Sequence, residues 1–163
     1  MSATAIVTSL EKLIMLYQSI NSLAKLKTEI IKKNDTDALS QLLIDEQKQL
    51  KAIEQTDKER EHAVKAFLQS KNAPITTTTL TDLSAWADES ERTQLETLKN
   101  KLLVEVSSLK QENQLNQQLI YQSLQFINVS LDMFRPSQQE FNYEKPVQQQ
   151  PNRGSRSMFD SKA

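Results

Sequence analysis

Glycine and proline are almost absent from most of this chain. The 163 residues contain one glycine and four prolines, and of these five only Pro74 lies before residue 136. Hairpins, sandwiches and phosphate-binding loops depend on such residues for their tight turns. The chain is therefore expected to be all-α, and its length and its 37% of hydrophobic residues suit a single domain with a modest core.

Apolar residues recur at helical spacing in three long stretches. Residues 3–33 alternate spacings of four and three, and additional residues such as Leu16 and Ile30 widen this face enough to contact more than one neighbour. Residues 36–71 follow several possible N-cap side chains, and residues 88–134 contain no helix breaker. These stretches predict an elongated antiparallel three-helix bundle or coiled coil with a long third helix.

The connection between the second and third helices contains Pro74 and a run of β-branched residues, so a loop is expected at residues 71–81. A short helical turn at residues 82–87, capped by Thr81, carries Trp86, the one tryptophan of the chain. A lone tryptophan is more often structural than ligand-binding, and Trp86 is expected to fold over the end of the bundle.

Polar residues interrupt two of the predicted helix faces. Glu46 falls in the apolar register of the second helix, and we interpret it as a solvated interruption, with partly open packing or a charge-paired layer as the alternatives. In the third helix Leu115 is the one apolar residue between Gln111 and Leu119. A tightly packed core is therefore not expected around the middle of the third helix.

After Phe134 the composition changes. Three prolines, the glycine and many glutamines follow, and such a segment cannot form a core. We therefore predict a helical domain at residues 1–134 and a disordered C-terminal tail at residues 135–163. Met158 and Phe159 form a small apolar island in this tail, either as a linear docking motif or by chance.

Composition excludes several classes of function. The formal net charge is −1, with 20 basic and 21 acidic residues, so no net field attracts nucleic acid. The chain has no cysteine and a single histidine, His62, expected at the surface, so we predict no metal site, no cofactor and no catalytic residues. No apolar run has the length of a membrane span, and no secretion signal precedes the first helix. We expect a cytosolic, non-enzymatic protein whose partner is another protein.

The end of the third helix carries an apolar stripe formed by Ile120, Leu124, Ile127, Leu131 and Phe134. If the second and third helices pair in antiparallel fashion, the third should overrun its partner by about 12 residues, or ~18 Å. The first helix could cover some of this overhang, but its apolar breadth does not show that it reaches so far. The stripe is therefore predicted to be a helix-binding surface rather than ordinary core.

Three segments of the chain resemble the FlgN family of flagellar export chaperones. They are the start of the first helix, Thr4-Ala5-Ile6-Val7-Thr8-Ser9-Leu10-Glu11-Lys12-Leu13, the start of the second, Asn34-Asp35-Thr36-Asp37-Ala38-Leu39, and the C-terminal end, Arg156-Ser157-Met158-Phe159-Asp160-Ser161-Lys162-Ala163. The resemblance implies a cytosolic chaperone without enzymatic activity. Such a protein would bind the C-terminal helical segments of the two hook-associated (hook–filament junction) proteins, prevent their premature association and deliver them to the flagellar type III export apparatus.

The same resemblance places the cargo-binding region at the end of the third helix. Carried over position by position, it falls on Leu119, Ile120, Ser123, Leu124, Ile127, Leu131 and Phe134, with Tyr121 as a candidate contact for the export gate. An ordinary rim tyrosine is the alternative for Tyr121. A monomer or weak homodimer fits the chaperone. The competing interpretation is a self-associating coiled-coil adaptor or structural protein, in which the stripe packs against a second copy. Membrane-surface binding is disfavoured because the first helix lacks a dense Lys/Arg strip.

Overall fold

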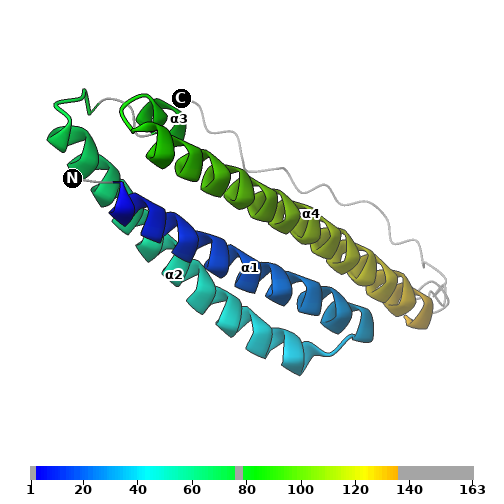
Figure 1. Ribbon diagram of the computed structural model, residues 1–163. Coiled ribbons are helices and arrows are strands. Elements are labelled where there is room, and N and C mark those ends of the chain that lie inside the picture. The colour runs from blue at the N-terminus through cyan, green and yellow to red at the C-terminus, as the bar shows by residue number, and fades with distance from the viewer. Residues whose placement is uncertain (1–2, 76–78, 136–163) are drawn as a thin grey trace, which may run out of the picture. The chain divides into compact units, whose positions relative to one another are not determined.

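The computed structural model describes residues 3–75 and 79–135, and these residues form four α-helices and no strand (Figure 1). The helices are α1 (Thr4–Lys33), α2 (Thr36–Ser70), α3 (Leu80–Ser84) and α4 (Glu89–Phe134). The predicted all-α class is confirmed, and the bounds of the three long helices agree with the prediction to within one residue. The predicted tail, including Met158 and Phe159, lies outside the described residues except for Arg135.

Packing divides the chain into two units, Met1–Ile127 and Asn128–Ala163, with the boundary inside α4. In the first unit α1 lies between α2 and α4 (Figure 1). α1 and α2 run antiparallel, because Lys12 pairs with Glu59 in the first half of α1 and Lys27 pairs with Glu46 in its second half. A turn of two residues joins these helices.

The ion pair between Lys27 and Glu46 shows that the interpretation of Glu46 as a solvated interruption was wrong. Both side chains are largely buried, and the ammonium of Lys27 contacts the carboxylate of Glu46 directly. A charge is tolerated in such a place when an opposite charge accompanies it. Glu46 therefore belongs to a charge-paired layer between α1 and α2, which was one of the two alternative interpretations.

α4 runs parallel to α1. Glu91 accepts a hydrogen bond from the backbone N–H of Ala3 at 2.8 Å, where both helices begin, and the Glu105 carboxylate accepts one from the Asn21 amide at 2.8 Å, farther along both. The up-down-up order of the three long helices is therefore confirmed. The buried residues of α4 are Leu95, Leu98 and Asn116. The beginning of α4 is thus held by apolar packing, and polar contacts hold it farther along α1.

The hydrophobic core is concentrated where α1 and α4 begin and where α2 ends. All four helices contribute to it, and its largest fully buried side chains are Ile6, Leu10, Val64, Leu83 and Leu95. Burial of each such aliphatic side chain contributes about 1.5–3 kcal/mol. This end of the first unit is therefore the closed and stable one, whereas the end of α1 and the start of α2 contribute no residue to this cluster.

One prediction about the closed end was wrong. The short helix begins two residues earlier than expected, because Thr79 rather than Thr81 caps it by accepting a hydrogen bond from the backbone N–H of Asp82 at 3.3 Å. Trp86 follows α3 with its side chain 43% exposed, and Leu83 of α3 is buried in the core at this end.

Candidate partner-binding groove

An apolar groove lies at the other end of the first unit, where α1 ends and α2 begins. Its volume is about 460 Å³. α4 forms one wall with Ile120, Ser123, Leu124, Phe126 and Ile127. The other wall consists of Ile30, Ile31, Asn34, Asp35, Thr36 and Leu39 from the end of α1, the turn and the start of α2. Most of these side chains are apolar, so the groove offers a hydrophobic surface bordered by a few polar groups.

The turn between α1 and α2 fixes one wall of the groove. Asn34 has a left-handed backbone with a φ of 55°, which ends α1 and reverses the chain. The N–H groups of Asn34 and Asp35 donate to the carbonyls of Ile31 and Ile30 at 3.1 and 3.3 Å. The Asp35 carboxylate accepts a hydrogen bond from the N–H of Ala38 at 3.0 Å and so caps α2. These hydrogen bonds therefore fix where α1 ends and where α2 begins beside the groove.

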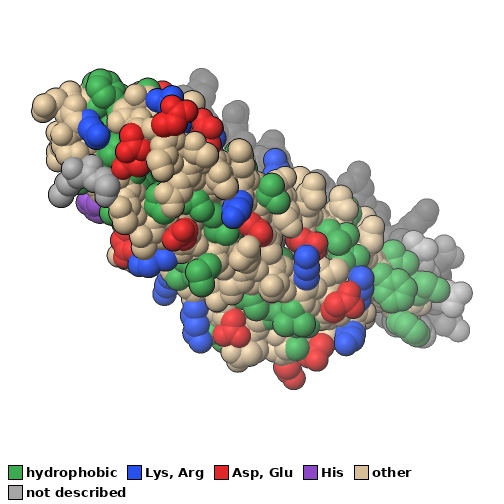
Figure 2. Space-filling view, in the orientation of Figure 1, with side chains coloured by type: hydrophobic (Ala, Val, Ile, Leu, Met, Phe, Trp, Pro, Cys, Tyr) green, Lys and Arg blue, Asp and Glu red, His purple; other side chains and the backbone are tan. Residues whose placement is uncertain are grey.

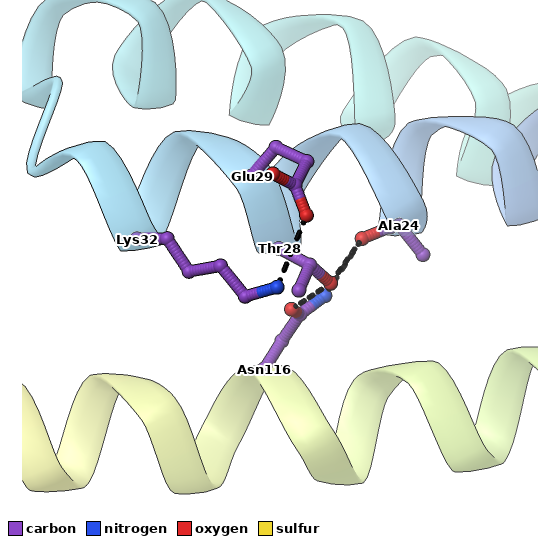
Figure 3. A network of polar contacts seen from close by, with 5 residues as sticks. All are labelled: Ala24, Thr28, Glu29, Lys32 and Asn116. Carbon is purple, nitrogen blue, oxygen red and sulfur yellow. Dashed lines mark hydrogen bonds and ion pairs between the residues drawn. The ribbon is translucent and has the colours of Figure 1, made fainter.

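A buried hydrogen-bonded layer holds α4 against α1 one helical turn before the groove. Asn116 is 3% exposed and points from α4 toward α1 (Figure 3). Its amide oxygen accepts a hydrogen bond from the Thr28 hydroxyl at 2.6 Å, and its amide nitrogen donates to the carbonyl of Ala24 at 2.9 Å. Both polar groups of the side chain are satisfied, so the amide is tolerated in the interior. The polar middle of α4 thus fixes how far this helix is shifted along α1.

The apolar side chains that α4 places in the groove remain open to solvent. Ile120, Leu124 and Ile127 are 39%, 54% and 49% exposed. Leu95 and Leu98, which lie on the same side of α4 near its start, are buried in the core. The same helix face is therefore covered at one end and half open at the other. Such a row of half-exposed aliphatic residues beside a groove is typical of a surface that binds an amphipathic helix.

The groove brings together only part of the predicted site. It is lined by Ile120, Ser123, Leu124 and Ile127, whereas Leu119 and Tyr121 are not among its lining residues. Tyr121 is exposed on α4, and its hydroxyl accepts a hydrogen bond from the Gln125 amide at 3.0 Å. The last two predicted residues, Leu131 and Phe134, are exposed and belong to the second unit.

Sequence reasoning did not find Phe126 or the wall that α1 and α2 contribute. Ile30 belongs to the widened apolar face of the first helix and Leu39 is an apolar residue at the start of the second, so both look like ordinary packing residues in the sequence. One signal could have revealed them: the turn between these helices has only two residues, so the end of α1 and the start of α2 must lie together. In an up-down-up bundle this pair of helix ends also lies beside the later part of α4.

The groove and its surroundings carry little charge. None of residues 113–131 is charged, and Asp35, the one charged residue among the described lining residues, uses its carboxylate to cap α2. On the face shown in Figure 2, Lys and Arg side chains are mixed with Asp and Glu side chains. Such a surface does not attract nucleic acid or an anionic membrane over a distance.

Within residues 3–75 and 79–135, no group of three or more His, Cys, Asp or Glu side chains could hold a metal ion. No helix in that part of the chain is long and apolar enough to cross a bilayer. His62 is exposed, as expected. The helical packing places the chain in the all-α class, and its open apolar groove has the character of a surface that can accept an amphipathic helix.

Comparison with known proteins identifies the family. A family model described as FlgN protein matches residues 1–151. The chain is also 38% identical over 165 residues to the uncharacterized protein YvyG of Bacillus subtilis (strain 168), and the match covers 100% of both chains. No solved structure was found that matches the chain. The chain belongs to the FlgN family, which is a family of flagellar export chaperones rather than of enzymes.

Proposed function

We propose that this protein is a cytoplasmic chaperone that binds the C-terminal helical segments of the hook-associated (hook–filament junction) proteins. It prevents their premature association and delivers them to the flagellar type III export apparatus. Membership of the FlgN family supports the chaperone role. The single observation that carries the assignment of the site is the open apolar groove beside Ile120, Leu124 and Ile127. In this proposal residues 1–134 form the chaperone domain.

Burial of the open side chains supplies the binding energy. Complete burial of a Leu or Ile side chain contributes about 1.5–3 kcal/mol, and Ile120, Leu124 and Ile127 already have roughly half of their surface covered. A cargo helix that lays its apolar face in the groove can therefore gain about 1 kcal/mol from each of these residues. The same contact covers the apolar face of the cargo, which is then no longer available to a second cargo molecule.

The other predicted residues also belong to α4. Leu119, Ser123, Leu131 and Phe134 are proposed as further cargo contacts, and Tyr121 is proposed as the contact for the export gate. Tyr121 is exposed and does not line the groove, so its ring stays accessible when a cargo helix fills the groove. This accessibility supports a role in delivery rather than in cargo binding.

The direct test replaces Leu124 and Ile127 with Asp in the full chain. Each substitution removes apolar contact and places a carboxylate in a groove whose one charged residue among the described lining residues, Asp35, is also acidic. We therefore expect the affinity for a C-terminal fragment of a hook-associated protein to fall at least about 100-fold. Isothermal titration calorimetry measures the affinity, and circular dichroism measures helix content and melting. The matched control is Leu103→Asp, because Leu103 is 56% exposed, close to the 54% of Leu124, and lies on α4 outside the groove.

Two results would contradict the proposal. If the double variant loses much of its thermal stability, the stripe is core and the groove is not a binding site. If it binds the fragment as well as the control does, the cargo binds elsewhere. Light scattering tests the alternative of a self-associating adaptor, since a stable homodimer that ignores the fragment would favour that alternative.

A further inference from the structure

A row of leucines continues from the groove along α2. Leu39 lines the groove, and Leu43 and Leu50 follow it roughly one and three helical turns later. Leu68 lies on the same side of α2 as Leu50, because the 18 residues between them make about five complete turns. Leu68 is buried in the core cluster that also contains Leu95 of α4. The row therefore lies on the side of α2 that faces α4.

α4 covers this side of α2 only at the closed end. Leu43 and Leu50 are 46% and 43% exposed, whereas Leu68 is buried. On α4, Val106 lies about five turns before Leu124 of the groove, and so on the same side of the helix, and it is 40% exposed. α2 and α4 thus border an open apolar strip that begins at the groove and runs toward the core.

Polar contacts with α1 hold the two helices at the base of this strip. α1 lies between α2 and α4 (Figure 1). Glu46, which stands between Leu43 and Leu50 in the sequence, is paired with Lys27 of α1. The charge of Glu46 is therefore already balanced within the protein, and a partner that lies on the strip needs no counter-charge for it. The surface that fits the strip is an apolar one.

The groove by itself offers little binding energy to a partner helix. Its apolar lining residues that are still open to solvent are Ile30, Leu39, Ile120, Leu124, Phe126 and Ile127. Burial of the remaining surface improves a binding constant about fivefold for each of them, or about 10⁴-fold together. A dissociation constant of about 1 μM requires about 10⁶-fold, and the entropy lost on association adds to this requirement. A helix bound in the groove must therefore bury apolar surface beyond it.

We propose that one cargo helix fills the groove and continues along the open strip, where it contacts Leu43 and Leu50 of α2 and Val106 of α4. It then acts as a fourth long helix beside α1, α2 and α4. Leu39 belongs both to the groove and to the leucine row, so one continuous helix can cover the two surfaces. This inference rests on the proposed function, because the helix is that of the same cargo.

The inference adds a contact surface on α2 and a length for the cargo helix. Val106 and Leu124 are 18 residues apart on α4, which corresponds to about 27 Å along the helix axis. A cargo helix that covers the groove and the strip therefore needs about 18 residues, with apolar residues repeated along one side over about five turns.

The test replaces Leu43 and Leu50 with Gln in the full chain, since both lie outside the groove. Glutamine is uncharged and a good helix former, so α2 is kept and only the apolar surface is lost. We expect the affinity for the C-terminal fragment of a hook-associated protein, measured by isothermal titration calorimetry, to fall about tenfold or more, with an unchanged melting temperature.

The matched control is Ile44→Gln. Ile44 is 52% exposed, lies next to Leu43 in the sequence and stands about 100° around the axis of α2 from it. Its substitution should change the affinity less than about twofold. A further variant, Leu43→Met with Leu50→Met, keeps the apolar surface and should bind the fragment like the unmodified protein.

Three results would overturn the contact with α2. The first is that the Gln double variant binds the fragment as Ile44→Gln does. The second is that the Gln double variant melts many degrees lower, which would make the leucine row core. The third is that light scattering shows a dimer that this variant separates while its cargo affinity is unchanged, since the strip then binds a second copy. Failure of the proposed function looks different: either the unmodified protein does not bind the fragment, or the Asp variants of the groove bind it normally.

Discussion

The layer formed by Thr28, Asn116 and Ala24 makes a sharp prediction about stability. Thr28→Val keeps the shape of the side chain but removes the hydroxyl that donates to the Asn116 amide oxygen at 2.6 Å. Asn116 is 3% exposed, so water cannot replace the lost donor at small cost. A buried polar group without a partner costs about 1–3 kcal/mol, and we expect the variant to lose this much free energy of unfolding.

Urea unfolding followed by circular dichroism measures this loss, and thermal melting should shift by about 2–4 °C for each kcal/mol in a chain of this size. The matched control is Thr97→Val. The Thr97 hydroxyl donates to the carbonyl of Thr93 at 2.9 Å on an exposed face of α4 and has no partner of its own on α1. Its loss should change the stability by less than about 0.5 kcal/mol.

A second substitution tests whether the loss of stability comes from the buried Asn116 amide that has lost its hydrogen-bond donor. In the double variant Thr28→Val, Asn116→Leu both partners are apolar, and the Ala24 carbonyl keeps its place in the hydrogen-bond ladder of α1. Replacement of both partners can be nearly neutral, so the double variant should recover most of the stability that Thr28→Val loses. The reasoning is refuted if Thr28→Val is as stable as the unmodified protein, or if the double variant is less stable than the single one.

Three further predictions concern other contacts of the first unit. Lys27→Met leaves the largely buried Glu46 without its counter-charge and should destabilise the protein by about 3–5 kcal/mol in urea unfolding, a loss that a second substitution, Glu46→Leu, should largely reverse. Asp35→Ala removes the cap of α2 and should cost about 1 kcal/mol by the same measurement, whereas an unchanged stability would show that the cap contributes nothing. The third concerns Tyr17, whose pKa is raised above its ordinary value of 10.0, first by burial and then by the charge of Asp57. The folded protein therefore holds this proton longer than the unfolded chain, so its stability is complete below pH 10.0 and falls as the pH rises through the folded pKa. Tyr17→Phe should make this alkaline decline shallower, and an identical decline in both proteins would contradict the assignment.

Local patterns predicted the helices well because amphipathic spacing is recorded within each segment. The three long helices begin and end within one residue of their predicted bounds. The sequence was less informative where two similar residues close together could play the same part. Thr79 and Thr81 offer the same capping hydroxyl, and only the packing of α3 selects Thr79. Glu46 interrupts an apolar face in the sequence, but its pairing with Lys27 depends on the register of α1 and α2, which no local pattern records.

In the candidate site, too, the sequence revealed residues that repeat along one helix but not residues that only the packing of helices brings together. Ile120, Leu124 and Ile127 were found because they repeat along one helix, and the structure places them in one groove. Ile30 and Leu39, on the facing wall, come from helices far away in the sequence and looked like ordinary packing residues. Asn116 looked like an obstacle to packing, because its two hydrogen-bond partners on α1 could not be foreseen.

The turn that forms one wall of the groove also offers a way to observe binding directly. Thr36 is exposed and lines the groove, and the chain contains no cysteine. Thr36→Cys would therefore give a single labelling site, and a fluorophore attached there would change its emission when the groove fills. Ala3, at the start of α1, lies 30 residues before Lys33, or about 45 Å along the helix. A second probe near Ala3 would remain far from the groove, so each molecule could carry both a sensor and its own internal reference.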